Sequence, residues 1–433
     1  MSSSWSFLFV TPSYIPFIGG AQTFQQAMAR RLVADGHRVV VLTSNACQPT
    51  DFWQRPASSN LSLPQREAID GVIVERLSLA YPPPSPIAFG LARRSGHWIS
   101  RSRLSVRLQQ PLVRGLAGWM PPLPGLKKAL NRLAGEVDLI QAVDSSWDGS
   151  FVAAAETAQH FKKPFVAVPL MHLGDARVQA HFRMVHQIQA YRTAAILLAL
   201  SRAEATAYAD MGVDPEQITI IPMGVDPALH PCSTELDGAT FRQRQNLTGP
   251  IVAFLGPNTY DKGAFTLAEA VGQLNWSGKP VNLVCAGAQS EELASFFRRL
   301  PSEIQEACRG RVRWLGAVDE SVKHQLLAAC DLLALPSQVD TFGIVLLEAW
   351  LHGKPVIGAR AGGIPEVLEE GHTGLLVSFG DVEALAQSIA WLLDHPEEAA
   401  RMGKRGQEMT LQRRTWDAVY HQLCSVYERC LVK

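Results

Sequence analysis

The stretch Pro336–Glu366, which reads PSQVDTFGIVLLEAWLHGKPVIGARAGGIPE, decides how this chain is interpreted. Its centre predicts a short helix over residues 344–351 that is apolar on every side except at Glu348. A helix that is apolar all round is a buried helix, and a carboxylate within it is costly unless it is paired or hydrogen-bonded. Asp340 lies eight positions earlier, in the loop that leads into the helix. The stretch therefore places two acids around the start of a buried helix.

A glycine pair follows the next predicted strand. Gly362 and Gly363 precede Ile364-Pro365-Glu366, and together they predict a strand-to-helix turn with free backbone amides. Amides at a helix start favour phosphate, whereas carboxylates suit sugar hydroxyls. The combination fits a polyol joined to a phosphate, and a nucleotide-sugar is such a molecule. The alternative is that Glu348 is a salt-bridged core residue and that the glycines only form turns.

This pattern resembles the donor site of the retaining glycosyltransferases of family four, which have two Rossmann-like domains. In that family a Glu, seven residues and a second Glu bind the donor sugar and the nucleotide ribose. The spacing is kept here, but Asp340 stands at the first position and Glu348 at the second. The resemblance implies that the donor site also includes Phe342, Gly343, Ile344, Gly363 and Ile364.

Length and composition bound the possibilities. A chain of 433 residues predicts two domains, and a net charge of zero gives no sign of nucleic-acid binding. Seven scattered cysteines without a C-x-x-C pair favour a reducing cytoplasm. We see no signal peptide, and no apolar stretch reaches the length of about 20 residues that spans a bilayer.

Short apolar runs alternate with helical patterns along the whole chain, which predicts parallel sheets covered on both faces. The expected fold is α/β with two doubly wound, Rossmann-like domains that face each other across a cleft. The predicted strands cover residues 6–11, 38–43, 72–77, 138–143, 164–169, 195–200, 251–255, 281–286, 312–315, 332–335, 355–358 and 374–377. The clearest helices cover residues 21–34, 266–273, 321–329, 344–352, 382–393 and 396–409.

The polar segment from Val225 to Gly249 predicts the domain boundary, because it contains two prolines and no convincing strand. We therefore expect an acceptor-binding domain over residues 1–225 and a nucleotide-sugar-binding domain over residues 226–411. A last helix, within residues 412–433, follows the second domain. In the resembled fold such a helix crosses back to the first domain.

The first predicted strand ends in PSYIPFIGGAQ, with Gly19 and Gly20 before a helix. This is not G-x-G-x-x-G, so a nicotinamide dinucleotide is disfavoured. In the resembled family this glycine pair faces the donor phosphates and forms part of the acceptor site. A plain turn is the alternative.

The second domain opens with IVAFLGPNTYDKG, where the family has an Arg and, five residues later, a Lys that neutralise the leaving diphosphate. Lys262 stands at the Lys position, but Pro257 replaces the Arg. Asn258 offers a neutral hydrogen bond instead, or Arg360 supplies the missing cation. A solvated loop lysine is the alternative for Lys262.

His172 follows the strand over residues 164–169 and resembles the family histidine near the reacting sugar carbon; a structural histidine is the alternative. Asp144 follows the strand over residues 138–143 and either orients an acceptor hydroxyl or caps a helix. The segment ITIIPMGVD resembles the family's joint between domains, with Met223 in place of Asn. The sequence contains no H-x-x-H motif and no Cys/His cluster, so we expect neither a metal nor another cofactor.

From Arg76 to Gly135, sixty residues contain ten Lys or Arg and no Asp or Glu. Aromatic and apolar residues lie between these cations. The pattern favours an anionic membrane surface or an anionic acceptor, and a solvated helical insertion is the alternative. A peripheral position at the cytoplasmic face of a membrane is the corresponding prediction.

The resemblance implies transfer of a hexosyl group from a UDP- or GDP-sugar to a hydroxyl of a glycan, glycolipid or lipid-linked acceptor, with retained configuration. His172, Lys262 and Asp340 would be the catalytic residues. Two alternatives stay open: a nucleotide-sugar-binding protein with little transferase activity, motivated by Pro257, and a nucleotide-sugar hydrolase or epimerase of the same fold.

Overall fold

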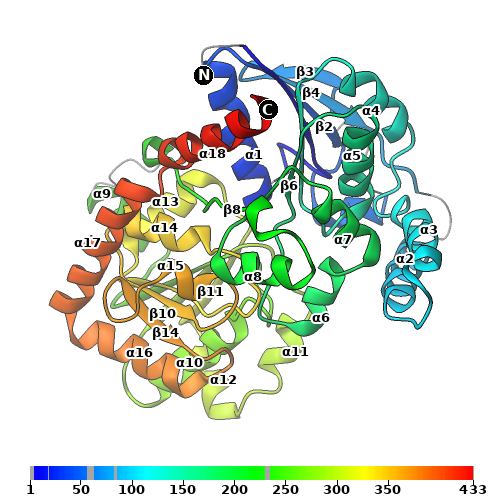
Figure 1. Cartoon of the computed structure of the whole chain (residues 1–433). Helices are drawn as coiled ribbons and strands as arrows, with labels where there is room; N and C mark the ends of the chain where they lie inside the picture. Colours follow the sequence, from blue (N-terminus) through cyan, green and yellow to red (C-terminus); the bar gives the residue numbers. More distant parts are fainter. Residues whose placement is uncertain (1–3, 18, 56–62, 82–84, 230–234, 433) are drawn as a thin grey trace. The chain divides into compact units, whose positions relative to one another are not determined.

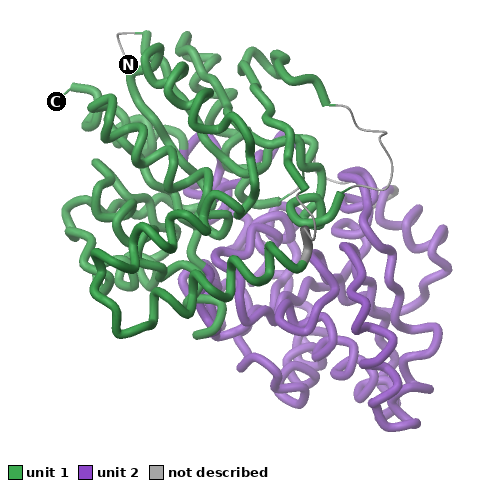
Figure 2. The backbone as a smooth tube through the Cα atoms, turned by 90° about the vertical axis from the view of Figure 1, so that its right-hand side faces the viewer, with its two compact units in different colours: residues 1–171, 176–222, 420–433 green, residues 172–175, 223–419 purple. Residues whose placement is uncertain are grey.

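A computed structural model describes residues 4–17, 19–55, 63–81, 85–229 and 235–432. The chain divides into two compact units, shown in different colours in Figure 2. Unit 1 holds Met1–Met171, Ala176–Pro222 and Tyr420–Lys433, and unit 2 holds His172–Asp175 and Met223–Val419. The main part of unit 2 begins at Met223, whereas the sequence placed the division after residue 225. The chain returns to unit 1 at Tyr420.

Unit 1 is built on an eight-stranded sheet with the order β3-β4-β2-β1-β5-β6-β7-β8. All neighbouring strands are parallel except the pair β3 and β4. The strands are β1 Ser6–Val10, β2 Arg38–Ser44, β3 Arg66–Ile69, β4 Val72–Leu77, β5 Leu139–Val143, β6 Phe165–Val168, β7 Ile196–Ala199 and β8 Ile218–Ile220.

The α-helices of unit 1 are α1 Gly20–Ala34, α2 Ser85–Ser100, α3 Val106–Ala117, α4 Leu126–Ala134, α5 Asp148–His160, α6 Ala176–Gln179, α7 Val185–Arg192 and α8 Arg202–Asp210 (Figure 1). Its 3-10 turns are η1 Pro49–Phe52, η2 Ala180–Phe182 and η3 Pro215–Gln217. The last helix, α18 Trp416–Leu431, lies mostly in unit 1. Tyr427 of α18 donates to Oε1 of Gln141 in β5 at 2.8 Å, and Tyr420 donates to Asp35 after α1 at 2.6 Å.

Unit 2 has a six-stranded, fully parallel sheet with the order β11-β10-β9-β12-β13-β14. Its strands are β9 Ile251–Leu255, β10 Asn282–Ala286, β11 Val312–Gly316, β12 Leu332–Leu335, β13 Val356–Ala359 and β14 Gly374–Val377. Its helices are η4 Pro227–Leu229, α9 Glu235–Arg244, α10 Ala264–Trp276, α11 Leu293–Phe297, α12 Ser302–Cys308, α13 Glu320–Ala329, α14 Ile344–Leu351, α15 Ile364–Val367, α16 Val382–Asp394 and α17 Pro396–Arg413.

Two parallel-sheet α/β units confirm the predicted fold class. Seven strands, β5, β6, β7, β9, β10, β12 and β13, are buried at every position, as expected for parallel sheets covered on both faces. All twelve predicted strands are found. The two strands that the sequence did not predict, β3 and β8, are the outer strands of the first sheet and are not fully buried.

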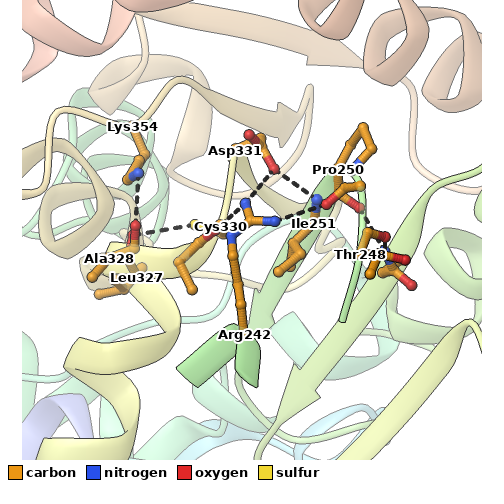
Figure 3. A network of polar contacts seen from close by, with 12 residues as sticks. Arg242, Thr248, Pro250, Ile251, Leu327, Ala328, Cys330, Asp331 and Lys354 are labelled. Atoms are coloured by element: carbon orange, nitrogen blue, oxygen red, sulfur yellow. Dashed lines mark hydrogen bonds and ion pairs between the residues drawn. The ribbon is translucent and has the colours of Figure 1, made fainter. Parts of the chain in front are cut away.

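The segment expected to form the domain boundary, in which the sequence shows no convincing strand, contains helix α9, which belongs to unit 2. Figure 3 shows how Arg242 of α9 holds this helix to the sheet. Its guanidinium donates to the carbonyl oxygens of Gly249 at 2.7 Å and Ala329 at 2.5 Å, and it pairs with Asp331 at 2.9 Å. Asp331 also accepts from the amide of Ile251 at 2.7 Å. The network therefore fixes the amino ends of β9 and β12.

The last helix lies within residues 412–433, as expected, but it does not start at the beginning of this range. Arg413 instead ends α17, and α18 begins at Trp416. Between them the chain pairs with the joint, because the amide of Val225 donates to the carbonyl oxygen of Arg414 and the amide of Trp416 to that of Val225, both at 2.9 Å. These two hydrogen bonds give the predicted joint segment a role in positioning the chain between α17 and α18.

Candidate functional site

The strand order of unit 2 determines where a ligand can bind. From β9 the chain proceeds outward to β10 and β11, and then returns to the other side of β9 with β12, β13 and β14. In such sheets ligands bind outside the carboxyl ends of the strands, at the point where the order reverses. That point lies between β9 and β12. The loops that follow these two strands contain Lys262 and Asp340.

The loop after β9 packs closely on the loop after β12. Gly263 has φ +80°, and a Cβ at this residue would lie 2.2 Å from the carbonyl oxygen of Pro336. Only glycine combines this left-handed backbone with so close an approach. The amide of Gln338 donates to the carbonyl oxygen of Asp261 at 2.8 Å, which joins the same two loops. The glycine at residue 263 thus brings Lys262 beside the loop that follows β12.

Lys262 and Asp340 form an ion pair. The Nζ atom of Lys262 donates to Oδ2 of Asp340 at 3.0 Å, and both side chains are about one-fifth exposed. Burial by itself would raise the pKa of Asp340, but the charge and the hydrogen bond of Lys262, together with His172, lower its pKa below the ordinary value. Asp340 is therefore a carboxylate at neutral pH and a hydrogen-bond acceptor for hydroxyl groups.

His172 joins the same loop and belongs to unit 2. Its Nδ1 atom lies 2.8 Å from the carbonyl oxygen of Val339 and 3.1 Å from Oγ1 of Thr341. Because a carbonyl oxygen can only accept, Nδ1 carries a hydrogen and donates it to Val339. The three residues expected to be catalytic, His172, Lys262 and Asp340, are thus brought together around residues 339–341.

The glycine pair at residues 362 and 363 lies directly on the backbone of this loop. A Cβ at Gly362, which has φ +60°, would lie 2.1 Å from the carbonyl oxygen of Asp340, and one at Gly363 would lie 1.8 Å from that of Thr341. The amide of Gly363 donates to the carbonyl oxygen of Asp340 at 2.9 Å. The expectation that this amide is free for sugar or phosphate is therefore wrong; it holds the loop. Ile364 is the first residue of α15 and is fully buried as a side chain.

Helix α14 begins directly behind Asp340. Phe342 is buried, Gly343 has φ +79° and caps the helix, and Ile344 is its first residue. The first amides of a helix have no partner within it and favour an anion. Trp350 anchors the other end, since it is fully buried and its indole nitrogen donates to the carbonyl oxygen of Thr373 at 3.0 Å. This anchoring explains why an apolar helix stands at the site.

Glu348 has a partner that the sequence did not predict. Its Oε1 atom accepts from Nζ of Lys323 in α13 at 2.8 Å, and Lys323 also pairs with Glu320 at 2.7 Å. Burial lowers the pKa of Lys323, but the charge of Glu348 and the hydrogen bonds to both glutamates raise it overall. The salt bridge that was the alternative interpretation of Glu348 therefore exists. No spacing motif links α13 to α14, so only the fold could show the pair.

The replacements suggested for the missing arginine have other partners. Asn258 is fully buried, and its side chain donates to the carbonyl oxygen of Gly287 at 3.1 Å, so it supports the loop after β10. Arg360 pairs with Glu370 at 2.6 Å. Sequence reasoning missed Arg414, whose guanidinium carbon lies 5.6 Å from the ring centre of Phe342. Burial and then Arg413 lower the pKa of Arg414.

The switch point of unit 1 lies between β1 and β5. Gly19 and Gly20 follow β1 at the start of α1, and the amide of Thr23 donates to the carbonyl oxygen of Gly19 at 3.0 Å. This position suits a ligand-binding turn. A part for the two glycines in donor or acceptor binding stays a prediction.

Asp144 follows β5 at the same switch point, with a left-handed backbone at φ 67°. Its Oδ1 atom accepts from the amide of Ser146 at 3.0 Å. It does not cap α5, whose N-cap residue is Trp147, so the capping alternative is wrong. The sequence also missed a buried pair below this turn, in which Nε2 of His186 lies 2.5 Å from Oδ2 of Asp148.

Two kinds of feature, a metal-binding cluster and a membrane-spanning helix, are absent from the part of the chain that the structure describes. Residues 4–17, 19–55, 63–81, 85–229 and 235–432 contain no group of three or more His, Cys, Asp or Glu side chains that could hold a metal ion. In the same ranges no helix has both the length and the apolar composition needed to cross a membrane.

The chain matches two family models. Residues 19–224 match the glycosyl transferase 4-like domain, and residues 239–409 match the glycosyl transferases group 1. The second match contains Lys262, Asp340, Glu348 and the glycine pair. The first contains Gly19, Gly20 and His172.

Curated relatives agree with these matches. D-inositol 3-phosphate glycosyltransferase of Corynebacterium efficiens is 35% identical over 225 residues, which is 49% of this chain and 51% of that protein. Glycogen synthase of Mycobacterium tuberculosis is 25% identical over 440 residues, which is 97% of this chain and 94% of that protein. The chain spans about half the length of the first relatives that it matches.

Solved structures share the fold. The structure of Anabaena HepE in complex with UDP has a TM-score of 0.71 and 24% identity, over 98% of this chain and 100% of that chain. Sucrose-phosphate synthase from Thermosynechococcus elongatus has a TM-score of 0.71 and 20% identity, over 99% of both chains.

Proposed function

Because the chain belongs to the glycosyltransferases of family four, we propose that it transfers a hexosyl group from a UDP- or GDP-sugar to a hydroxyl of a glycan, glycolipid or lipid-linked acceptor, with retained configuration. The observation that carries this proposal is the ion pair of Lys262 and Asp340, at 3.0 Å, beside His172 at the switch point of unit 2. A cation and a carboxylate at that point suit the two halves of a nucleotide-sugar.

Each residue has a role that follows from its chemistry. Lys262 and the first amides of α14 bind the diphosphate and stabilise the charge that grows on it as it leaves. Asp340 accepts hydrogen bonds from the sugar hydroxyls. Nε2 of His172 accepts a hydrogen bond at the reacting end of the sugar.

Glu348 accepts a hydrogen bond from the ribose, while Lys323 holds its carboxylate in place at 2.8 Å. This arrangement makes the salt bridge a support for ribose binding, so the two interpretations of Glu348 are compatible. Lys323 is then a positioning residue, because it acts through Glu348 rather than through the donor.

The reaction proceeds on one face of the sugar. The bond between the anomeric carbon and the diphosphate oxygen breaks, and the acceptor oxygen forms a bond to the same carbon. The acceptor proton passes to an oxygen of the leaving diphosphate. Catalysis then rests on positioning and on fixed charges. We propose that no metal ion is required, and unchanged turnover after treatment with a chelator is the expected result.

A second function is favoured by one specific observation. Pro257 removes a cation that the resembled family uses, and Asn258 and Arg360 have other partners in the structure. A protein that binds the nucleotide-sugar without transferring it is the corresponding candidate. A hydrolase or epimerase would instead consume the donor when no acceptor is present.

A donor-consumption assay separates these functions. The full chain is incubated with UDP- and GDP-sugars, with and without a lipid extract, and the free nucleotide and the sugar products are quantified. The proposal predicts nucleotide release that depends on the extract and is lost in Asp340→Asn. Equal release without an acceptor would support a hydrolase, an altered donor sugar would support an epimerase, and binding without turnover would support the binding protein.

A further inference from the structure

Exposed apolar side chains concentrate on helices α2 and α3 of unit 1 and in the turns that follow them. Eight of the fifteen exposed large hydrophobic residues in the described chain lie between residues 87 and 119. Figure 1 shows the two helices side by side, and α3 packs in turn against α5 and α7. A concentrated apolar surface of this kind marks an interaction site, whereas singly scattered exposed residues do not. The eight residues are Ile87, Leu91, Trp98, Leu104, Val106, Leu108, Leu112 and Trp119.

The exposed residues follow the helical period. Ile87, Leu91 and Trp98 recur at intervals that place them on one side of α2, and Trp98 is 73% exposed. Leu108 and Leu112 form a similar stripe on α3, and the opposite side of α3 contributes the buried residues Gln109, Val113 and Ala117. Both helices thus have an outer apolar side as well as an inner one.

The charges on this surface all have one sign. Arg94, Arg101, Arg103 and Arg107 are exposed, and none pairs with an acid among the residues that the structure describes. Some of the cations within residues 76–135 are paired with acids, however. Arg76, Arg114 and Arg132 pair with Glu67, Glu156 and Glu75, which lie outside the stretch. The unpaired cations therefore concentrate beside the apolar stripes. We call these four arginines and the eight apolar residues the α2–α3 face.

We propose that the α2–α3 face docks this protein onto an anionic lipid membrane. Apolar side chains enter the boundary between headgroups and acyl chains, and arginines beside them contact anionic headgroups. Tryptophan prefers this interface, and Trp98 and Trp119 supply it here. The complete lack of acids in residues 76–135 favours an anionic lipid surface over a neutral one.

The inner side of α2 links this surface to the switch point of unit 1. The ring of Phe89 lies 5.7 Å from that of Trp147, and the guanidinium carbon of Arg93 lies 6.0 Å from the same ring. Trp147 lies in the turn after β5, three residues beyond Asp144. If the proposed function holds, the docked helix therefore lies beside the acceptor side of unit 1, and the acceptor is one that the membrane carries.

Vesicle co-sedimentation of the full chain tests the docking without any donor or acceptor. The vesicles are pure phosphatidylcholine or phosphatidylcholine with one-third phosphatidylglycerol, at low and at high salt. We expect pelleting with the anionic vesicles at low salt, release at high salt because screening shortens the range of the arginine charges, and little pelleting with the neutral vesicles.

Two variants separate the contribution of the arginines to vesicle binding from that of the apolar side chains. Replacing Arg94, Arg101, Arg103 and Arg107 by Gln is expected to weaken binding several-hundredfold, at roughly fivefold for each charge. The triple variant Trp98→Ser, Leu108→Ser, Leu112→Ser is expected to weaken binding at least tenfold. The matched control combines Trp276→Ser and Arg309→Gln, two exposed residues of unit 2, and should bind like the original chain.

Each outcome decides the proposal. Loss of binding in both variants, with an unchanged melting temperature and an unchanged thermal shift with nucleotide-sugar, supports docking by this face and leaves the donor site intact. Absence of pelleting at low salt, equal pelleting of the variants and the original chain, or self-association through this face without vesicle binding would overturn the proposal. Because the donor shift is measured separately, failure of the docking and failure of the proposed function are distinguishable.

Discussion

Gly362 and Gly363, which pack on the loop after β12, and Gly371, in the turn before β14, provide a test in which backbone strain and steric contact are separated. Gly371 has φ +70° and no atom within 4 Å of an added Cβ, so Gly371→Ala introduces strain alone. Gly363 has φ −91°, which any residue can adopt, but its Cβ would lie 1.8 Å from the carbonyl oxygen of Thr341. Gly362 combines both, with φ +60° and a Cβ at 2.1 Å from the carbonyl oxygen of Asp340.

The magnitudes follow from these distances. Ordinary Cβ contacts begin near 3.4 Å, so the loop at Asp340 must move by about 1.3 Å (3.4 − 2.1) in Gly362→Ala. A left-handed alanine costs about 1–2 kcal/mol, and forced overpacking costs about 1–3 kcal/mol more. We expect Gly371→Ala to lower the free energy of unfolding by about 1–2 kcal/mol and Gly362→Ala by about 2–5 kcal/mol.

Function should separate the three variants more clearly than stability does. A displacement of about 1 Å in a catalytic loop can lower turnover about 100-fold. We expect this loss, measured as nucleotide release, in Gly362→Ala and Gly363→Ala but not in Gly371→Ala. Chemical unfolding and donor consumption are measured on the same preparations. Turnover in Gly363→Ala equal to that in Gly371→Ala would refute the argument that close packing of these loops forms the donor site.

Three further changes test single contacts. Lys262→Met removes the cation that lowers the pKa of Asp340. Donor binding needs the carboxylate, so when the pH is lowered this variant should lose donor affinity at a higher pH than the original chain. Coincident pH profiles of donor affinity would contradict the assignment. Lys323→Met leaves Glu348 buried without the ammonium group of Lys323. It should lower the free energy of unfolding by about 1–3 kcal/mol and weaken nucleotide binding. Tight binding of UDP or GDP by a destabilised variant would limit Lys323 to a structural role. Arg242→Met removes the network at the amino ends of β9 and β12 and should lower the free energy of unfolding by about 1–2 kcal/mol. Donor affinity should stay unchanged, because the site lies at the opposite ends of these strands. A loss of donor affinity in calorimetry would contradict this separation.

The lowered pKa of Asp340 also makes the stability of the protein depend on pH. A carboxylate whose pKa is lower in the folded state stabilises the protein at pH values above its unfolded pKa, and this contribution is lost as the pH falls through the folded pKa. For Asp340 the contribution is therefore present at neutral pH and disappears in acid. In Lys262→Met this loss should shift to a higher pH.

Sequence patterns predicted what depends on local periodicity. The buried strands read as continuous apolar runs, and α14 read as a helix that is apolar all round. Helix α9 was missed because it has little apolar periodicity. Contacts of Arg242 hold it to the sheet instead. The outer strands β3 and β8 were missed because they are partly exposed.

The site shows the same division. Motif spacing placed Lys262 and Asp340 together, because loops after the neighbouring parallel strands β9 and β12 meet at one edge of the sheet. His172 follows β6 of the other sheet, and only the family resemblance assigned it to the same site. The amide of Gly363, the bond from Asn258 to Gly287 and the pair of Lys323 and Glu348 depend on which backbone atoms meet across loops. No spacing in the sequence records those contacts. The exposed apolar side of α2 and α3 lies within residues 76–135, for which the sequence predicted an anionic membrane surface or an anionic acceptor, with a solvated helical insertion as the alternative.

The most direct test is a thermal-shift titration of the full chain with UDP, GDP and their common sugar conjugates, with Asp340→Asn and Glu348→Ala as comparison variants. A ligand that binds the folded state raises the melting temperature by mass action. The proposal predicts a shift with one nucleotide family that is reduced in Glu348→Ala, and an additional shift from the sugar that is reduced in Asp340→Asn. Absence of a shift with every nucleotide, or shifts that both variants retain in full, would contradict the assignment of the donor site to unit 2.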